Sequence, residues 1–272
     1  MIAAMSDLVP ARIKQMIVGS PSHPSLLANA IRAALDQVPG EPFPCLRCSG
    51  ILKGYKMRVD WSRFRAFAYG TWESDVVRAI KEVVREGFVA IDIGAHHGYY
   101  ALILSELVGS QGHVIAFEPM PSNFRLLQEN IGLNNCVNVE IVNKRLSDSS
   151  GRLVGSVRNE GDSGTFSISQ QDSANSIAID VVSLDDFLSQ RQVPVNFIEI
   201  DVEGAESLVL SGARKTIELN HPILLIEVHH FGKHLDSTQV PQQLTELGYK
   251  FKWIVKWQDT SHLIATWKGE SS

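Results

Sequence analysis

Two glycines bracket a short turn that could bring the polypeptide backbone close to a ligand. The turn reads Asp92-Ile-Gly-Ala-His-His-Gly98 and lies between an apolar run and a helix-forming run. Glycine allows the backbone to bend sharply and to approach a ligand closely, while the N-terminus of the following helix favours a carboxylate. The Asp92 carboxylate could pair with an ammonium group. We therefore expect this turn to bind a ligand that carries an amino-acid head group.

Glu118 stands at the end of the next expected strand, where a carboxylate can accept hydrogen bonds from both hydroxyls of a ribose. A nicotinamide dinucleotide also has a ribose, but the turn lacks its G-x-G-x-x-G fingerprint, and Asp92 would repel a pyrophosphate. S-adenosylmethionine has an ammonium group, a ribose and no phosphate. The turn and the two acids therefore favour S-adenosylmethionine over NAD as the cofactor.

Strands and helices alternate along the part of the chain that contains these residues. Apolar runs predict strands at 88–93, 113–117, 137–142, 195–200 and 223–228, and helical periodicity predicts helices at 74–86, 99–108, 121–131, 205–219 and 240–247. Two final strands, 249–255 and 262–267, predict an antiparallel hairpin. The pattern indicates a Rossmann-like α/β fold with a mostly parallel sheet and helices on both faces. Ligands of such sheets bind beyond the carboxyl ends of the strands.

The chain before this alternation has a different character. Residues 1–40 show helical spacing, residues 41–46 are proline-rich and predict a linker, and residues 51–69 predict short antiparallel strands. We interpret residues 1–70 as a small N-terminal cap and residues 71–272 as the α/β domain.

One later segment, 151–182, interrupts the alternation and predicts an extended excursion. Its middle, 159–176, is rich in glycine and serine, which suits a lid that orders when a substrate binds. Ser122 is expected to cap a helix that Gly132 ends, and Ser183 is expected to open a capping box.

Composition excludes several classes of protein. The net charge is −5, and the sequence shows no basic run of the kind that binds nucleic acid. No apolar stretch is long enough to predict a membrane span. The N-terminal apolar stretches are short and are broken by Asp7, Pro10 and Arg12, so they do not resemble a signal peptide. We therefore expect the protein in the cytoplasm.

The cysteines do not indicate a metal or redox centre. Cys45 and Cys48 form a C-x-x-C pair, but a structural zinc site usually needs a second such pair, and the third cysteine, Cys136, stands alone. Reduced and partly buried thiols are the better interpretation.

The chain from Gly70 to His229 resembles the FkbM-type family of class I S-adenosylmethionine-dependent methyltransferases. The matching strings are YGTWESDVV, FVAIDIGAHHGYYALILSE, VIAFEPMPSNFRLLQENIGLNN, VSLDDFL, FIEIDVEGAESLVLSGA and ILLIEVHH. The resemblance implies a seven-stranded sheet with a reversed final hairpin. It also implies methyl transfer to an oxygen atom, commonly on sugars, polyketides or similar small molecules.

The resemblance also implies which residues hold the cofactor. Asp92, Gly94 and Gly98 correspond to the loop on the methionine side, and Glu118 corresponds to the ribose ligand. Glu73 corresponds to an acid of the cofactor pocket, and Ser147 and Asp148 correspond to the segment that edges the adenine. We therefore expect the cofactor to be bound by Glu73, Asp92, Gly94, Ala95, His96, Gly98, Glu118, Pro119, Ser147, Asp148 and Asp201. The D-x-E-G-x-E signature of the family corresponds to residues 201–206.

This chain departs from the family pattern at two positions. His96 stands where the family often has asparagine, and it either contacts the cofactor or only supports the turn. Glu199 stands where relatives usually carry lysine, and in an extended strand Glu199, Asp201 and Glu203 would share one side. Carboxylates that lie close together raise one another's pKa or require a cation.

A hydroxyl acceptor would need a group that removes its proton. Asp201 is the first candidate for this catalytic role, His229 is the second, and Glu203 and His230 are further candidates. Each also has a structural interpretation: strand-end histidines often order loops, and Glu203 and Glu206 could cap a helix.

A divalent metal is a possible but not favoured cofactor. Asp201, Glu203, Glu227 and His229 could supply ligands, but strand spacing alone does not show that they converge. We therefore predict no metal, and the expected partner is a small-molecule or glycan hydroxyl acceptor. The alternatives to a methyltransferase are an NAD-dependent oxidoreductase and a non-catalytic cofactor-binding protein on the same fold.

Overall fold

Five parallel strands and a final antiparallel hairpin form the central sheet in the part of the chain that the structure describes. In this computed structural model the described residues are 43–46, 50–59, 66–67, 71–158, 165–168, 176–191, 193–230, 236–257 and 259–269. In neighbour order the seven strands are β12 (Tyr249–Lys256), β13 (Thr260–Trp267), β11 (Ile223–His229), β10 (Phe197–Ile200), β3 (Val89–Ile93), β4 (His113–Phe117) and β5 (Val139–Val142). β13 is antiparallel to β11 and β12, and the strands from β11 to β5 are parallel. The predicted mostly parallel sheet with an antiparallel final hairpin is confirmed.

Contacts divide the chain into two compact units. The first consists of residues up to Ser74 and of Gln128–Cys136, and the second consists of Asp75–Leu127 and Val137–Ser272. The helices expected within residues 1–40 lie outside the described residues, as does Cys48. The domain boundary at residue 70 stays a prediction.

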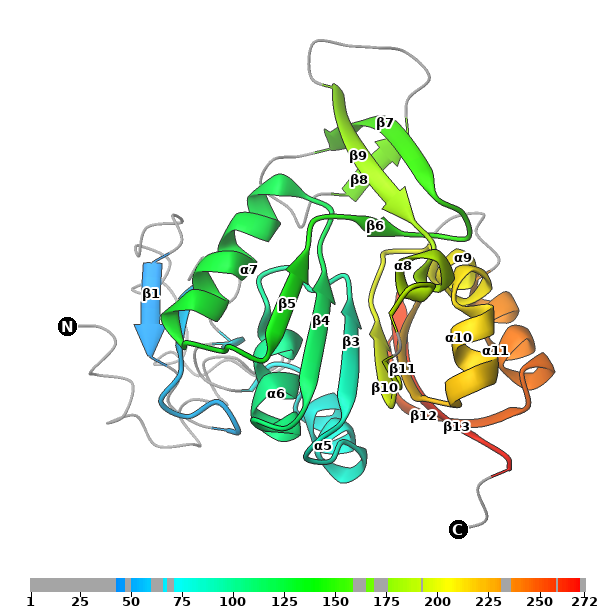
Figure 1. Ribbon diagram of the computed structural model, residues 1–272, viewed down its shortest axis with the longest axis horizontal. Coiled ribbons are helices and arrows are strands. Elements are labelled where there is room, and N and C mark those ends of the chain that lie inside the picture. Colours follow the sequence, from blue (N-terminus) through cyan, green and yellow to red (C-terminus); the bar gives the residue numbers. More distant parts are fainter. Residues whose placement is uncertain are drawn as a thin grey trace, which may run out of the picture. The chain divides into compact units, whose positions relative to one another are not determined.

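The chain reverses its direction of travel across the sheet between β3 and β10. From β3 it proceeds through β4 to β5 at one edge, and it later returns to β10 on the other side of β3 (Figure 1). Such a switch point opens a crevice at the carboxyl ends of the strands. The strands around it are buried on both faces, which explains their continuous apolar runs.

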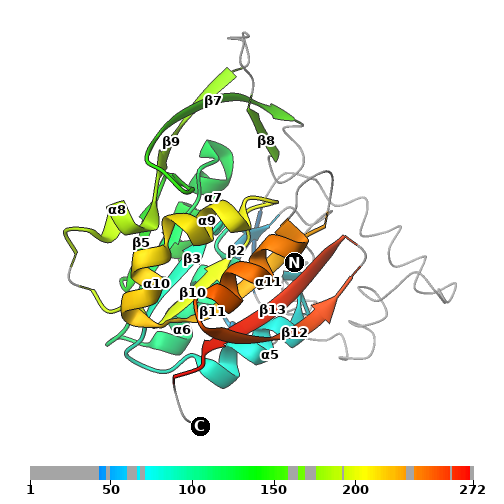
Figure 2. The same ribbon diagram turned by 90° about the vertical axis from the view of Figure 1, so that its right-hand side faces the viewer.

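The helices follow the predicted alternation with some changes at their ends. They are α5 (Ser74–Val83), α6 (Tyr99–Val108), α7 (Pro121–Leu133), α8 (Leu184–Leu188), α9 (Glu206–Gly212), α10 (Arg214–Asn220) and α11 (Asp236–Glu246). Figures 1 and 2 show α9, α10 and α11 together on one face of the sheet and α6 on the other. The single helix expected at 205–219 is wrong, because Ala213 leaves the helical region with φ −109° and ψ 5°.

Two of the three residues that were expected to begin or end a helix do not do so. α7 begins at Pro121 and runs through Gly132 to Leu133, so Ser122 is not its cap and Gly132 does not end it. The third signal is confirmed in part. The hydroxyl of Ser183 accepts a hydrogen bond of 3.1 Å from the backbone N–H of Asp186 at the start of α8, but the backbone N–H of Ser183 donates to the hydroxyl of Ser150 at 3.2 Å, so the capping box is not complete.

The excursion at 151–182 contains strands that the sequence reading missed. β6 (Arg145–Leu146), β9 (Ser176–Val182), β7 (Gly151–Arg158) and β8 (Thr165–Ile168) form a second sheet in this order. Glycine and serine between the strands hid their alternating pattern. Residues 159–164 and 169–175, which make up most of the expected lid, lie outside the described residues.

The first unit contains a strand pair that was only half expected. β2 (Lys56–Val59) lies within the predicted strand region, but its antiparallel partner β1 (Phe43–Leu46) lies in the segment predicted as a linker. The side chain of Asn134 joins β2 to the end of α7, since it accepts from the N–H of Lys56 at 2.8 Å and donates to its carbonyl at 2.7 Å. β1 contains Pro44, and a proline inside a strand argues against a strand prediction, which explains why this segment was predicted as a linker.

Among the described helices, none has the length and apolar character that crossing a membrane requires.

Candidate active site

The glycine turn lies where the carboxyl ends of β3 and β10 come closest. A side chain at Gly94 would place its Cβ 1.8 Å from the backbone oxygen of Asp201, so only glycine fits there. Gly94 and Gly98 have φ values of 94° and 88°, in the left-handed region, and Gly98 directly precedes α6. The predicted turn therefore presents its backbone at the switch point, with Ala95 buried inside it.

Glu118 joins the glycine turn to the end of β4. Its Oε2 accepts the backbone N–H of His96 and its Oε1 accepts the backbone N–H of Met120, both at 2.8 Å. Burial raises the pKa of Glu118 to about 7, although these two hydrogen bonds lower it. Pro119 follows directly, and its carbonyl accepts from the side chain of Asn143 at 3.2 Å.

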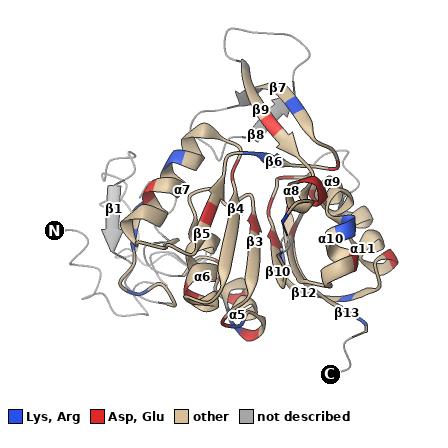
Figure 3. Ribbon diagram, viewed as in Figure 1, with Lys and Arg blue, Asp and Glu red and all other residues tan. Residues whose placement is uncertain are grey.

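Asp92 and Glu199 form a pair of acids inside the sheet. They occupy the same register position on β3 and β10, and each is only 1% exposed. Burial raises the pKa of Asp92 to about 7, and a hydrogen bond with the Glu199 side chain lowers it. Figure 3 shows acidic residues, in red, on both strands. Asp92 thus keeps a proton that a nearby ammonium group could displace.

His96 and His97 fill the apex of the turn. Their rings stack with centroids 3.7 Å apart, and His96 adopts a φ of 49°, which is unusual for a residue other than glycine. Burial, and then the charge of His97, lower the pKa of His96 well below its ordinary value. His96 is therefore neutral at neutral pH.

Ser147, Asp148 and Glu73 are the other residues predicted at the cofactor. Ser147 follows β6, and its carbonyl would lie 1.9 Å from a Cβ at Gly212, so α9 packs closely against this segment. The exposed Asp148 carboxylate accepts from the Ser147 hydroxyl at 3.2 Å. Glu73 belongs to the first compact unit, where its φ is 43°.

Acidic side chains surround His229 at the carboxyl ends of β10 and β11. His229 Nδ1 lies 2.7 Å from Oε1 of Glu206, which also accepts the backbone N–H of Gly204 at 2.9 Å. On the other side of the ring, Nε2 lies 3.4 Å from Glu203 and 3.9 Å from Asp201. These side chains were predicted as separate candidates, and the structure brings them together.

Local geometry explains this convergence. β10 and β11 are adjacent and parallel with Ile200 opposite Ile226, so Asp201 just beyond β10 meets the last residues of β11. Positive φ values at Glu203 and Gly204, 54° and 92°, then turn the chain back so that α9 begins at Glu206. We call Asp201, Glu203, Glu206, Glu227 and His229 the His229 cluster.

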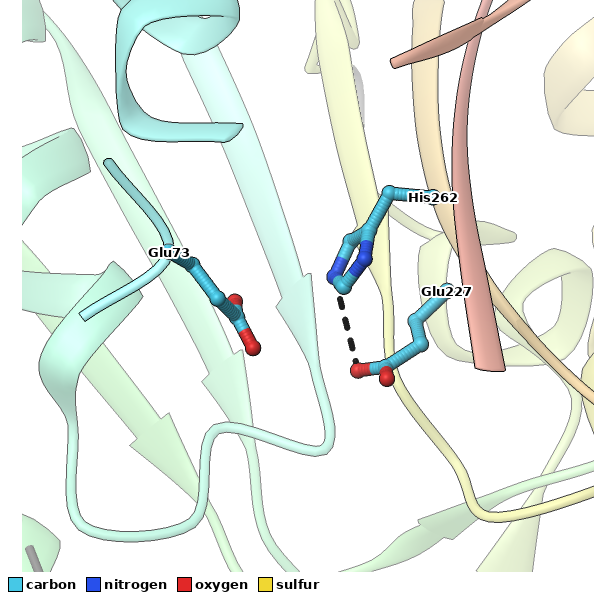
Figure 4. Close-up of side chains that lie close together, drawn as sticks. All are labelled: Glu73, Glu227 and His262. Carbon is cyan, nitrogen blue, oxygen red and sulfur yellow. Dashed lines mark ion pairs between the residues drawn. The ribbon is translucent and has the colours of Figure 1, made fainter. Parts of the chain in front are cut away.

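Glu227 completes the His229 cluster from within β11. Burial raises its pKa, while His229 and hydrogen bonds with Thr260 and Asp201 lower it. Its Oε2 also lies 3.5 Å from Nε2 of His262 on β13, the contact dashed in Figure 4. Burial, with the charge of His229 second, lowers the pKa of His262 to about 4, so this histidine is neutral at neutral pH. His262 was not predicted as a site residue, because its neighbour Glu227 lies far from it in the sequence.

Residues 92–251, which are more than half of the chain, match the methyltransferase FkbM domain. The chain belongs to the FkbM methyltransferase family. The match begins at Asp92 and includes the glycine turn, Glu118 and the His229 cluster. An FkbM methyltransferase uses S-adenosylmethionine, so the cofactor predicted from the turn is confirmed.

The comparisons also found similarity to individual proteins. The hexuronic acid methyltransferase AglP of Haloferax volcanii is 31% identical over 177 residues, which are 64% of this chain and 68% of that protein. The methyltransferase FkbM of Methylobacillus flagellatus is 20% identical with a TM-score of 0.47, covering 75% of this chain and 54% of that one. Aeropyrum pernix fibrillarin with natively bound S-adenosyl-L-methionine is 12% identical with a TM-score of 0.45, covering 70% and 72%.

Proposed function

We propose that the protein transfers the methyl group of S-adenosylmethionine to a hydroxyl oxygen of a sugar or a similar small acceptor. The observation that carries the proposal is the His229 cluster, which supplies proton acceptors at the carboxyl end of β10, beside the glycine turn. The name of the Haloferax volcanii relative, a hexuronic acid methyltransferase, supports a sugar-type acceptor.

The cofactor would lie over the glycine turn. We assign the ammonium group to Asp92, the methionine carboxylate to the N-terminus of α6 with Gly94, Ala95 and Gly98, and the ribose to Glu118. The remaining assignments are Ser147 and Asp148 at the adenine, with Pro119, Asp201 and the backbone of His96 as further contacts. The burial of Asp92 favours this arrangement, because a buried acid gains most from a cation.

The reaction then needs alignment and one proton transfer. A lone pair of the acceptor hydroxyl forms the new carbon–oxygen bond while the bond from sulfur to the methyl carbon breaks, and its electron pair stays on sulfur. The hydroxyl proton passes to the His229 cluster, through Asp201, Glu203 or His229. General-base catalysis of this kind contributes about 10²- to 10⁴-fold.

A hexuronic acid offers both hydroxyl and carboxylate oxygens to a methyl donor. A carboxylate has no proton to lose, and it would be repelled by the four acids of the His229 cluster. The cluster is therefore better suited to a hydroxyl, which needs a proton acceptor and carries no charge.

Ligand-induced thermal stabilisation followed by transfer of a labelled methyl group tests the proposal. We expect S-adenosylmethionine and S-adenosylhomocysteine to raise Tm, NAD to leave it unchanged, and Asp92→Ala to remove the shift. Label should then appear in base-stable ethers on sugars, rather than in esters that mild base releases. A shift with NAD alone, or label only in esters, contradicts the proposal.

A further inference from the structure

We propose that Asp201, Glu227 and His229 bind one divalent cation at the carboxyl ends of β10 and β11. The existence of the site does not depend on the proposed function, but its role in catalysis does. The ligands come from the ends of two adjacent strands.

The donor atoms of these three side chains already converge. One atom from each, a carboxylate oxygen of Asp201 and of Glu227 and a ring nitrogen of His229, lie within 4.8 Å of one another. Ligands on opposite sides of a bound ion lie roughly 4 Å apart. A small inward movement of the side chains would therefore complete three ligand positions, and the partial exposure of Asp201 leaves room for water or an acceptor oxygen.

Glu206 fixes His229 in the orientation that a ligand requires. It lies against Nδ1 at 2.7 Å and is completely buried, so this contact turns Nε2 towards Asp201 and Glu203. Histidines that bind metals almost always donate their second ring N–H to a carboxylate or carbonyl in this way. This contact distinguishes the site from an ordinary group of acids.

The charge around His229 also calls for a cation. Four carboxyl groups, those of Asp201, Glu203, Glu206 and Glu227, gather around one imidazole. Glu227 is hydrogen-bonded to Asp201, so oxygen atoms of the two side chains lie close together. Two further neighbours are His262, which lies against Glu227, and Arg145, whose charge interacts with that of Glu206.

The donor set suggests the class of ion. Two carboxylate oxygens and one imidazole nitrogen suit Mn²⁺, Fe²⁺ or Zn²⁺, while a purely oxygen set would favour Mg²⁺ or Ca²⁺. A bound ion would lower the pKa of an acceptor hydroxyl. His229 would then be a ligand, and Glu203, whose side chain is 43% exposed, would be left to receive the proton.

Titration of the chelator-treated full-length protein with Mn²⁺, followed by electron paramagnetic resonance, tests the site. We expect one Mn²⁺ per chain, and we expect Glu227→Gln and His229→Gln each to weaken binding by about tenfold or more. Glu82→Gln, which changes an exposed glutamate on α5 in the same way, should bind Mn²⁺ like the wild type. Circular dichroism checks that each variant is folded.

Several results would overturn the inference. Wild-type protein that binds no Mn²⁺ at millimolar concentration excludes the site, and so does binding that is equal in wild type, Glu227→Gln and Glu82→Gln. If His229→Gln abolishes methyl transfer but leaves Mn²⁺ binding intact, the imidazole is a base and not a ligand. Calorimetry of the same samples measures the binding of S-adenosylmethionine separately. Loss of that binding would contradict the proposed function and not the cation site.

Discussion

Oε1 of Glu206 lies 2.7 Å from Nδ1 of His229, and neither side chain is more than 4% exposed. The same oxygen accepts the backbone N–H of Gly204, so one carboxylate fixes both the start of α9 and the orientation of the imidazole. The second and third acids of the D-x-E-G-x-E signature therefore have different tasks. Glu203 faces the reaction region, and Glu206 holds the ring from behind.

Replacing Glu206 by glutamine should separate these tasks. The amide keeps the shape of the side chain, but it removes the charge that holds a proton on Nδ1. We expect kcat to fall about 10- to 100-fold, as for other groups that orient a ligand or base, with the cofactor Kd unchanged. Steady-state kinetics and ¹⁵N chemical shifts of the imidazole would measure both effects. Normal kcat with an altered tautomer would contradict a positioning role.

The close approach of Gly94 to Asp201 predicts that Gly94→Ala is severely disruptive. The new Cβ would lie 1.8 Å from a backbone oxygen, and the φ of 94° is unfavourable for alanine. We expect a loss of about 2 kcal/mol or more in unfolding free energy and no detectable cofactor binding.

Gly132→Ala is the matched control. Gly132 lies within α7, and nothing stands within 4 Å of its missing Cβ. This change should stabilise the protein by roughly 0.5–1 kcal/mol, and urea denaturation would compare the two variants. Equal effects at the two glycines would show that contact with Asp201 does not matter.

Stability of the cofactor-free protein should fall as the pH rises towards 7. The pKa of Asp92 is raised from 3.8 to about 7, so between these values the folded protein keeps a proton that the unfolded chain has lost. Each such group lowers stability by about 1.4 kcal/mol per pH unit across this window, and the contribution is constant below it. Asp92→Asn, which cannot ionise, should show a smaller slope in urea denaturation at several pH values. Parallel slopes for the two proteins would rule out this origin.

Cofactor affinity should follow the opposite trend. An ammonium group pairs only with an ionised Asp92, so binding below pH 7 must displace the proton. We expect S-adenosylmethionine to bind more tightly as the pH rises from 5.5 to about 7.5 and to release protons on binding at the lower pH. Calorimetry in buffers of different ionisation enthalpy counts these protons.

His96→Asn tests whether the unusual turn is specialised. Asparagine adopts the left-handed conformation of His96 more readily, and the backbone hydrogen bond to Glu118 does not depend on the side chain. We expect Tm to be unchanged or higher and the cofactor Kd to change less than about threefold, or below 0.7 kcal/mol. A much weaker Kd would mean that the ring contacts the cofactor directly.

Much of the fold could be predicted because its signals are local. Apolar runs and helical spacing placed α6 and β4 at their observed residues, and the order of elements indicated the sheet. The errors arose where distant contacts override local pattern. β1 becomes a strand only because β2 pairs with it, and α9 ends at Gly212 because the chain at Ser147 lies against it.

The candidate site shows the same division. Asp201, Glu203 and His229 were expected near one strand edge, since parallel strands end there together. The distances among them, the contact of Glu206 with Nδ1 and the proximity of His262 depend on side-chain packing between strands far apart in sequence. The pairing of Glu199 with Asp92 was not predicted, because it depends on the register of β10 against β3.

The buried Asp92–Glu199 pair has a consequence for the life of the protein in a cell. Lysine at position 199 would neutralise Asp92 permanently, whereas glutamate leaves this task to the incoming sulfonium amino acid. A ligand that binds only the native state protects it in proportion to its free concentration. We therefore expect the abundance of the protein and its resistance to proteolysis to follow the supply of the methyl donor. Starvation for methionine should then lower the amount of the enzyme as well as its activity.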